Sequence, residues 1–155
     1  QKGKAGELCG VFSSESKGVL YLNCKCGVYG EMKNVPETDT LYPVAFNDEV
    51  KKGSAQIVST VDENGPMVYD IEITKISYEN SEDKNLVIKI TDEDLLNKTG
   101  GIVQGMSGSP IIQDGKLVGA VTHVFINDPT QGYAIFSRTM LEKMRSADES
   151  VKKAS

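Results

Sequence analysis

The sequence contains no tryptophan, a single histidine and only 6% aromatic residues. It also has no apolar run of the roughly 18 to 20 residues that a helix needs to cross a bilayer, and no basic-then-apolar signal segment at its start. The lack of a long apolar run excludes a membrane-spanning helix in this chain. Valine, isoleucine, glycine and threonine recur in short runs, which favours β-sheet over a helical bundle. We expect one soluble domain over residues 1–155, with a frayed tail over residues 148–155.

Positive charge is also scarce. The chain has 17 lysines and arginines against 22 aspartates and glutamates, a formal net charge of -5. A nucleic-acid partner requires a clustered surplus of basic residues, so this composition argues against one. An acidic surface of this kind mostly indicates solubility.

The three cysteines, Cys9, Cys24 and Cys26, are an odd number. Structural zinc sites usually use four ligands with wider spacing, and the one histidine could not complete such a set. We therefore expect no metal and no other cofactor. One disulfide, or unpaired thiols acting as small buried apolar residues, both remain open.

Short segments rich in β-branched and aromatic residues recur between glycine, asparagine, aspartate and proline. Asp114-Gly115 suits the positive φ angles of a type I′ turn and predicts a hairpin of residues 110–113 with 116–125. This spacing of strands is typical of a barrel or sandwich. The other predicted strands cover residues 7–12, 19–22, 41–46, 55–60, 67–76, 85–90 and 133–136.

Two helical segments are predicted among these strands. Thr91 should cap a short helical turn over residues 91–96, with Asp94 three residues further on. Ser137 should cap a helix from Arg138 to about Ala147, because apolar residues fall on one of its faces there.

The run Gly105-Met106-Ser107-Gly108-Ser109-Pro110 carries the pattern of an acyl-transfer site. A turn that accommodates Gly105 can direct the main-chain N–H groups of Gly105 and Ser107 at one point, an oxyanion hole. Ser109 precedes a proline and is pushed toward an extended conformation, so we predict Ser107 as the nucleophile. The alternative is a serine- and glycine-rich turn in a binding domain.

This motif and the hairpin after it resemble the nucleophile region of chymotrypsin-like peptidases, although Ser109 replaces the usual second glycine. Residues 100–129, with Ile90-Thr91-Asp92 and residues 70–73, are similar to the stage IV sporulation protein B family of serine peptidases. The resemblance covers nearly the whole chain. It implies an all-β fold, a partial chymotrypsin-like antiparallel β-barrel with a short helical turn and a C-terminal helix.

The resemblance further implies a catalytic His, Asp and Ser in that chain order. Ser107 matches the nucleophile, and Asp92, fifteen residues before it, matches the acid that orients the imidazole. Asp92 could instead only favour the dipole at a helix start. The catalytic His belongs to a Gly-His segment upstream, which this sequence lacks. The chain would then be the C-terminal portion of the peptidase domain and nearly inactive alone.

His123, the only histidine, lies sixteen residues after Ser107. The chymotrypsin-like resemblance implies that its strand lines the substrate pocket, where a histidine suits acidic or amide side chains; Gly101 is also assigned to substrate binding. A structural histidine in the core and a substitute general base remain open alternatives.

The leading hypothesis is a serine endopeptidase that acts through an acyl-enzyme on Ser107. By resemblance, its substrates would be proteins or peptides, including itself and a membrane-bound regulatory protein in sporulation signalling. The same resemblance implies export from the forespore into the space between forespore and mother cell. The alternative is a non-catalytic β-domain that binds peptides on a peptidase scaffold.

Overall fold

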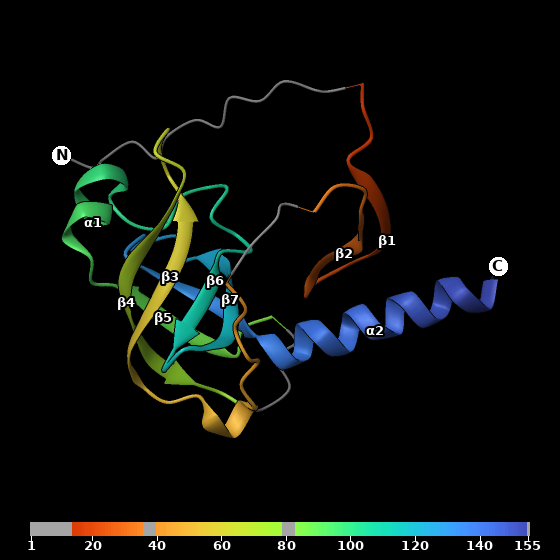
Figure 1. Ribbon diagram of the computed structural model, residues 1–155. Coiled ribbons are helices and arrows are strands. Elements are labelled where there is room, and N and C mark those ends of the chain that lie inside the picture. The colour runs from red at the N-terminus through yellow and green to blue at the C-terminus, as the bar shows by residue number, and fades with distance from the viewer. Residues whose placement is uncertain (1–13, 36–39, 79–82, 155) are drawn as a thin grey trace.

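The computed structural model describes residues 14–35, 40–78 and 83–154, and its described part is built mainly of strands (Figure 1). Two α-helices and one short 3-10 helix accompany them. In chain order the elements are β1 (Gly18–Cys24), β2 (Gly27–Met32), η1 (Asn47–Glu49), β3 (Gly53–Thr60), β4 (Pro66–Ile76), β5 (Leu86–Ile90), α1 (Glu93–Thr99), β6 (Pro110–Gln113), β7 (Lys116–Val124), β8 (Gln131–Phe136) and α2 (Ser137–Ala154).

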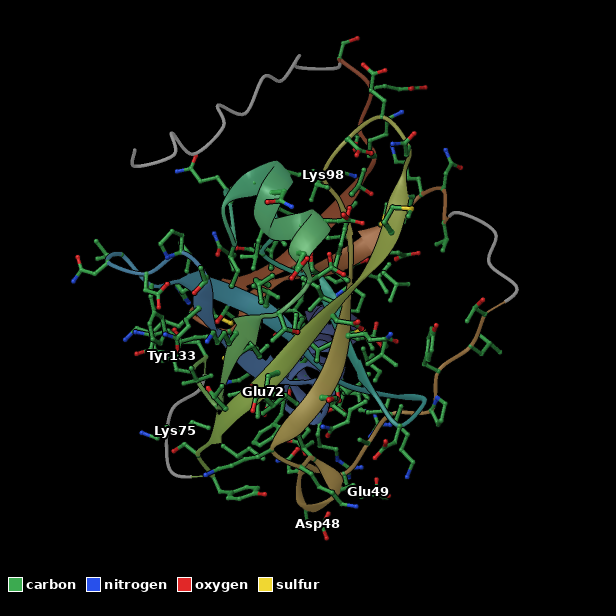
Figure 2. The ribbon with its side chains drawn as sticks, turned by 90° about the vertical axis from the view of Figure 1, so that its left-hand side faces the viewer. Asp48, Glu49, Glu72, Lys75, Lys98 and Tyr133 are labelled. Atoms are coloured by element: carbon green, nitrogen blue, oxygen red, sulfur yellow. The ribbon has the colours of Figure 1, made fainter. Side chains whose placement is uncertain are left out.

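Six strands close into an antiparallel barrel in the order β3-β4-β5-β8-β7-β6. Alternate residues along each strand face opposite sides. Ile57, Ile71 and Ile88 therefore fill the barrel and are at most 1% exposed, whereas Glu72 and Lys75 of β4 lie on its outer surface (Figure 2). The seam between β3 and β6 consists of two residue pairs. Closure removes the exposed strand edges that invite aggregation.

The β6–β7 hairpin turns at Asp114-Gly115, as the sequence predicts. Both residues have positive φ angles, 51° for Asp114 and 73° for Gly115, as a type I′ turn requires. Pro110 pairs with Ala120 across the hairpin. The chain just after Ser107 is therefore held against β7.

Helix α1 begins one residue later than predicted, and the prediction of Thr91 as its cap is wrong. Asp92 is the N-cap, and its Oδ1 accepts a hydrogen bond of 2.9 Å from the N–H of Leu95. The N–H of Thr91 instead donates to the main-chain oxygen of Asp70, 3.1 Å away. The helix ends at Gly100, whose φ of 74° is left-handed, a common way to end a helix.

A two-stranded ribbon, β1 paired with β2, stands outside the barrel beside α2 (Figure 1). Cys26 and Tyr29 of the ribbon, Ala120 of β7, Ile135 of β8 and Ala147 of α2 form a buried apolar cluster. This cluster is separate from the barrel core and joins the ribbon and α2 to the outer surface of β7 and β8. No helix among the described residues combines the length and apolar character needed to cross a bilayer.

The mostly β fold, with its barrel and C-terminal helix, is confirmed. The predicted strand 41–46 is wrong: that segment makes one isolated bridge, between Val44 and Leu117. Pro43 has no N–H to donate to a ladder, and Leu41 is 88% exposed despite its apolar character. Strand β2 was not predicted, and the predicted strand 7–12 lies outside the described residues. Helix α2 extends past the predicted end to Ala154.

The ribbon should depend on Tyr29, which is 8% exposed and donates from its hydroxyl to the main-chain oxygen of Cys26. We predict that Tyr29→Ala raises amide hydrogen exchange in β1 and β2 by about tenfold or more, because local opening exposes those amides. Exchange in β5 should not change. Val28→Ala is the matched control, since Val28 is 56% exposed. Equal effects of the two variants on ribbon exchange would contradict the prediction.

Candidate active site

The loop that joins α1 to β6 carries the serine motif. One buried side chain and two glycines determine its conformation. Met106 is only 2% exposed and anchors the loop in the barrel core. Gly105 and Gly108 have φ angles of 97° and 91°, in a region where a residue with a Cβ atom is strained. Ser107 lies between them and is exposed. The glycines and the buried methionine together place Ser107 at the surface.

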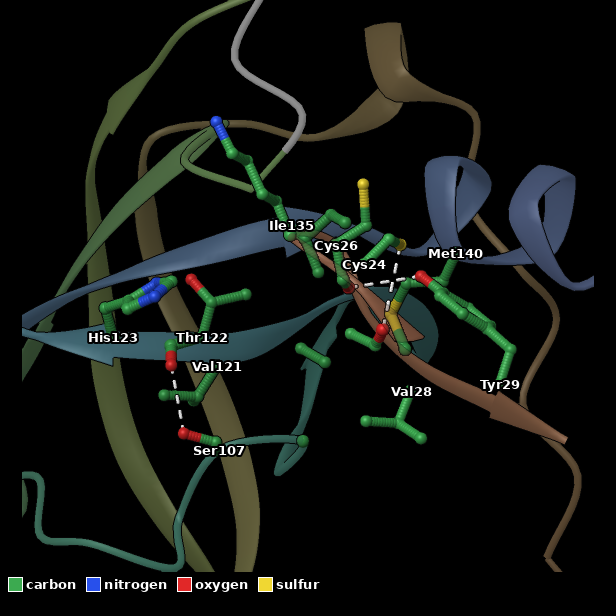
Figure 3. Close-up of a pocket in the computed structure, with 14 residues that line it drawn as sticks. Cys24, Cys26, Val28, Tyr29, Ser107, Val121, Thr122, His123, Ile135 and Met140 are labelled. Atoms are coloured by element: carbon green, nitrogen blue, oxygen red, sulfur yellow. Dashed lines mark hydrogen bonds between the residues drawn. The ribbon is translucent and has the colours of Figure 1, made fainter. Parts of the chain in front are cut away.

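The two serines of the motif have opposite environments. The exposed Ser107 donates from its Oγ to the main-chain oxygen of Thr122, 2.9 Å away (Figure 3). Ser109 is 9% exposed, and its Oγ donates to the Oγ of Ser59 at 3.0 Å. A nucleophile must reach its substrate, so these positions support Ser107 and not Ser109.

The main-chain N–H groups of Gly105 and Ser107 have no hydrogen-bond acceptor within the described part of the chain. Their neighbours are used: the N–H of Met106 donates to Val103 and that of Gly108 donates to Val121. Oriented donors that the fold leaves unused are what an oxyanion hole requires. The arrangement is thus compatible with the predicted oxyanion hole.

Strand β7 has a bulge at Thr122, beside Ser107. The pairing of β7 with β8 shifts register between Val121 and His123, which leaves Thr122 outside the ladder. Its main-chain oxygen is therefore available to the Ser107 hydroxyl, and its own hydroxyl donates to the main-chain oxygen of Asp83. The regular alternation of side chains along a strand is therefore interrupted just before His123.

A pocket of about 410 Å³ opens beside Ser107, between the tip of the ribbon and the outer surface of β7, β8 and α2 (Figure 3). Ala120, Ile135 and Met140 give it an apolar wall, and His123 also lines it. No hydrogen bond joins His123 to Ser107, and in Figure 3 the imidazole and the hydroxyl lie on opposite sides of β7. His123 thus shares the pocket with Ser107 but does not contact its hydroxyl.

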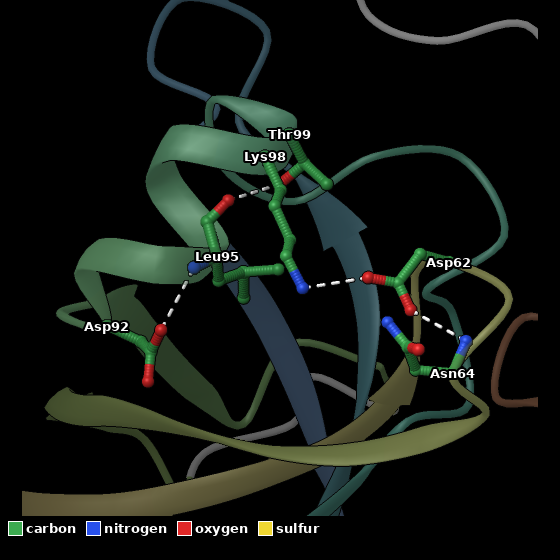
Figure 4. A network of polar contacts seen from close by, with 6 residues as sticks. All are labelled: Asp62, Asn64, Asp92, Leu95, Lys98 and Thr99. Carbon is green, nitrogen blue, oxygen red and sulfur yellow. Dashed lines mark hydrogen bonds and ion pairs between the residues drawn. The ribbon is translucent and has the colours of Figure 1, made fainter.

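Asp92 lies at the start of α1 and is not among the residues that line this pocket. Its Oδ1 accepts from the N–H of Leu95 at 2.9 Å (Figure 4). Its Oδ2 accepts from the N–H of Asp70 at 3.3 Å. The capping role, one of the two alternatives for this residue, is therefore present in the structure. Two main-chain donors also hold the carboxylate in one orientation.

An ion pair holds α1 against the turn between β3 and β4. Lys98 Nζ lies 2.7 Å from Asp62 Oδ2, and Asp62 Oδ1 accepts from the N–H of Asn64 (Figure 4). The hydrogen bond from Lys98 lowers the pKa of Asp62 below its usual range. The pair is partly exposed, so its contribution to stability is small, but it steadies the helix that precedes the serine loop.

Comparison with known families matches the model of the SpoIVB peptidase S55 family to residues 1–141. The chain belongs to the SpoIVB peptidase S55 family. The family indicated by the resemblance in the sequence is thus confirmed. Membership of this peptidase family suggests a hydrolase that acts on proteins. No curated protein matches the chain.

One further position of this S55 chain, Gly101, was singled out from the sequence as a substrate-binding residue. Gly101 is buried with a φ of 138°, and a Cβ atom there would collide with the main-chain oxygen of Pro129. Its N–H and its oxygen both interact with the Thr99 hydroxyl. Tight packing is therefore sufficient to explain this glycine, which does not line the pocket beside Ser107.

The cysteines bear on this pocket, because Cys24 and Cys26 line it from the ribbon tip. Neither forms a disulfide among the described residues, which also hold no cluster suited to a metal ion; Cys9 lies outside the described residues. Burial, with smaller effects of Cys26 and Cys24, raises the pKa of Tyr29 to about 12. Tyr29 therefore stays neutral. Sequence reasoning missed this ribbon wall, because no local motif brings the ribbon to Ser107.

The serine pair inside the barrel leads to a prediction about stability. Ser109→Ala should lower the free energy of unfolding by about 1 to 2 kcal/mol, because it leaves the buried Ser59 hydroxyl without its donor. Ser107→Ala should change it by less than about 0.5 kcal/mol. Urea unfolding followed by circular dichroism measures both. The double variant Ser59→Ala/Ser109→Ala should recover part of the loss; equal costs at Ser107 and Ser109 would contradict the assignment.

Proposed function

We propose that this S55 chain carries the nucleophile of a serine endopeptidase that cleaves proteins through an acyl-enzyme on Ser107. The observation that carries the proposal is the exposed Ser107 between two left-handed glycines, with unused main-chain N–H donors and an open pocket beside it. Ser107 Oγ attacks the carbonyl carbon of the scissile peptide, the C–N bond breaks, and water then hydrolyses the ester. The Gly105 and Ser107 N–H groups stabilise the oxyanion.

The general base is proposed to come from outside this chain. The chain has one histidine, His123, and it makes no hydrogen bond to the Ser107 hydroxyl. That hydroxyl is bonded to the Thr122 oxygen instead. An imidazole supplied from elsewhere would take the Ser107 proton and return it to the leaving amine. The Ser107–Thr122 bond must break for this transfer, and the chain alone should be nearly inactive.

Asp92 is proposed as the acid that orients this imidazole. Its carboxylate is held by two main-chain donors yet has acceptor capacity left, because a carboxylate offers about four lone-pair sites. Asp92 would then serve both as helix cap and as catalytic acid. His123, which lines the pocket, is proposed to contact substrate rather than to act as base.

The substrates we propose are proteins, including the enzyme itself and a membrane-bound regulatory protein, in the extracytoplasmic space between forespore and mother cell. The competing function is a peptide-binding β-domain without catalysis. Within the described residues no base is hydrogen-bonded to the Ser107 hydroxyl, which favours this competing function for the chain alone.

Covalent labelling tests the nucleophile. In the full-length protein, a fluorophosphonate probe should label wild type and Ser109→Ala but not Ser107→Ala, because only Ser107 is exposed. Intact-mass and peptide mass spectrometry locate the adduct. Labelling of Ser109, or no labelling of a folded full-length protein, would sink the proposal and favour the binding domain.

The two roles of Asp92 separate by substitution. Asp92→Asn keeps an oxygen for the N–H of Leu95, and asparagine caps helices as well as aspartate. Its amide NH₂ group cannot accept from the N–H of Asp70, which donates to the second carboxylate oxygen in the wild type. The free energy of unfolding should therefore fall by about 1 kcal/mol or less, whereas kcat of the full-length protein should fall by about 10² or more. Asp92→Ala should lose the same activity and about 1 to 2 kcal/mol of stability, because both acceptors are removed. Full activity in Asp92→Asn would mean that Asp92 only caps the helix.

A further inference from the structure

The pocket beside Ser107 has the opposite charge to the chain as a whole. The net charge is -5, yet the cationic side chain of Lys25 and the hydrogen-bonding imidazole of His123 line the pocket, and within the described residues no aspartate or glutamate does. Asp83, which contacts Thr122, does so through its main-chain oxygen, and its side chain does not line the pocket. A positive region in an acidic protein attracts negatively charged ligands.

Lys25 supplies the positive charge of this pocket. It is exposed on the turn between β1 and β2. Within the described chain it has no hydrogen bond and no ion pair, unlike Lys98 with Asp62 and Lys116 with Glu49. A lysine without a carboxylate partner keeps its charge available, and its flexible stem can follow a ligand.

The floor of the pocket has a different chemistry from its mouth. Ala120, Ile135 and Tyr29 are at most 8% exposed and present apolar surface, and Met140 of α2 adds an adaptable side chain. The volume of about 410 Å³ lies within the usual range for ligand pockets, about 300 to 1,000 Å³. An apolar floor below a cationic mouth suits a peptide in which an apolar side chain lies beside an acidic one.

On the basis of the proposed function, we propose that Lys25 selects acidic peptides for cleavage at Ser107, with His123 as a second donor. The substrate places an apolar side chain on the floor and a neighbouring carboxylate at Lys25. An imidazole N–H can donate to that carboxylate in either protonation state. The ribbon is then the specificity-determining wall of the site, and Lys25 acts on substrate choice rather than on the bond-breaking step.

Binding can be measured without catalysis, on the chain itself. Two capped peptides, acetyl-Ala-Leu-Glu-Ala-Ala-amide and its Gln counterpart, are titrated into the ¹⁵N-labelled chain and followed by NMR. The Glu peptide should bind about fivefold or more tightly at about 50 mM salt, with shifts at Gly27, Gly108 and His123, which line the pocket. This preference should shrink at about 500 mM salt, because screening weakens exposed charge pairs.

Charge reversal at one position identifies the residue. Lys25→Glu should abolish or invert the preference for the Glu peptide. Lys33→Glu is the matched control: Lys33 is also exposed, follows the same ribbon and changes the net charge equally, but does not line the pocket. Equal affinity for the two peptides, shifts outside the pocket, or equal effects of the two variants would overturn the role of Lys25.

The outcome for catalysis is read separately. An uncharged fluorophosphonate should label Ser107 equally in full-length wild type and Lys25→Glu, while kcat/KM for Glu-containing peptides falls about fivefold or more in the variant. Labelling with unchanged peptide preference overturns only the role of Lys25. The chain could instead bind the Glu peptide selectively while Ser107 is not labelled by the fluorophosphonate. Lys25 would then remain a ligand contact, but its role in selecting substrates for cleavage would be overturned.

Discussion

Two main-chain hydrogen bonds between the serine loop and strand β7 determine the geometry of the whole site. The N–H of Gly108 donates to the oxygen of Val121 at 2.8 Å, and the N–H of Val121 donates to the oxygen of Ser109 at 3.0 Å. They attach the loop to a strand of a closed barrel, whose position is fixed by pairing on both sides. The Ser107 hydroxyl, its acceptor on Thr122 and the pocket wall all take their positions from this attachment.

Different parts of the molecule hold the serine and form the pocket wall proposed to recognise substrate. The barrel core fixes the serine loop through the buried Met106, whereas the ribbon contributes to the second, smaller cluster around Tyr29 and Ile135. An isolated two-stranded ribbon is marginally stable in water, so the ribbon depends on the packing of this cluster. The pocket thus has one wall in the barrel and one wall in an element of lower expected stability. Substrate selection by Lys25 would reside in that second wall.

The acid position combines structure and proposed chemistry in one carboxylate. Asp92 caps α1 and accepts from the N–H of Asp70 on β4, so it joins the helix to the barrel. Lys98 and Asp62 add a weak, partly exposed ion pair near the other end of the same short helix. The helix therefore contacts other elements at both ends directly before the loop that carries Ser107. A carboxylate fixed in this way could orient a partner imidazole without rearrangement of its own.

Local sequence was sufficient wherever a few neighbouring residues determine the conformation. Asp114-Gly115 specified its turn because both positions need positive φ angles. The recurrence of short β-branched segments between turn residues indicated a barrel or sandwich. The family resemblance and the serine motif could also be read directly. The prediction for residues 41–46 failed because their apolar content suggested a strand. Pro43 has no N–H for a ladder, and the segment forms only an isolated bridge.

Tertiary structure alone decided how distant segments meet. Strand β2 and the ribbon wall could not be found from local sequence, because the contact of Tyr29 with β8 and α2 depends on long-range packing. The cap at Asp92 rather than Thr91 depends on where β5 leaves the sheet. The bulge at Thr122 interrupts the side-chain alternation of β7 just before His123. The sequence determined which residues could do chemistry, whereas packing determined which of them share one pocket, because proximity between remote residues is a property of the closed barrel and the elements packed on it.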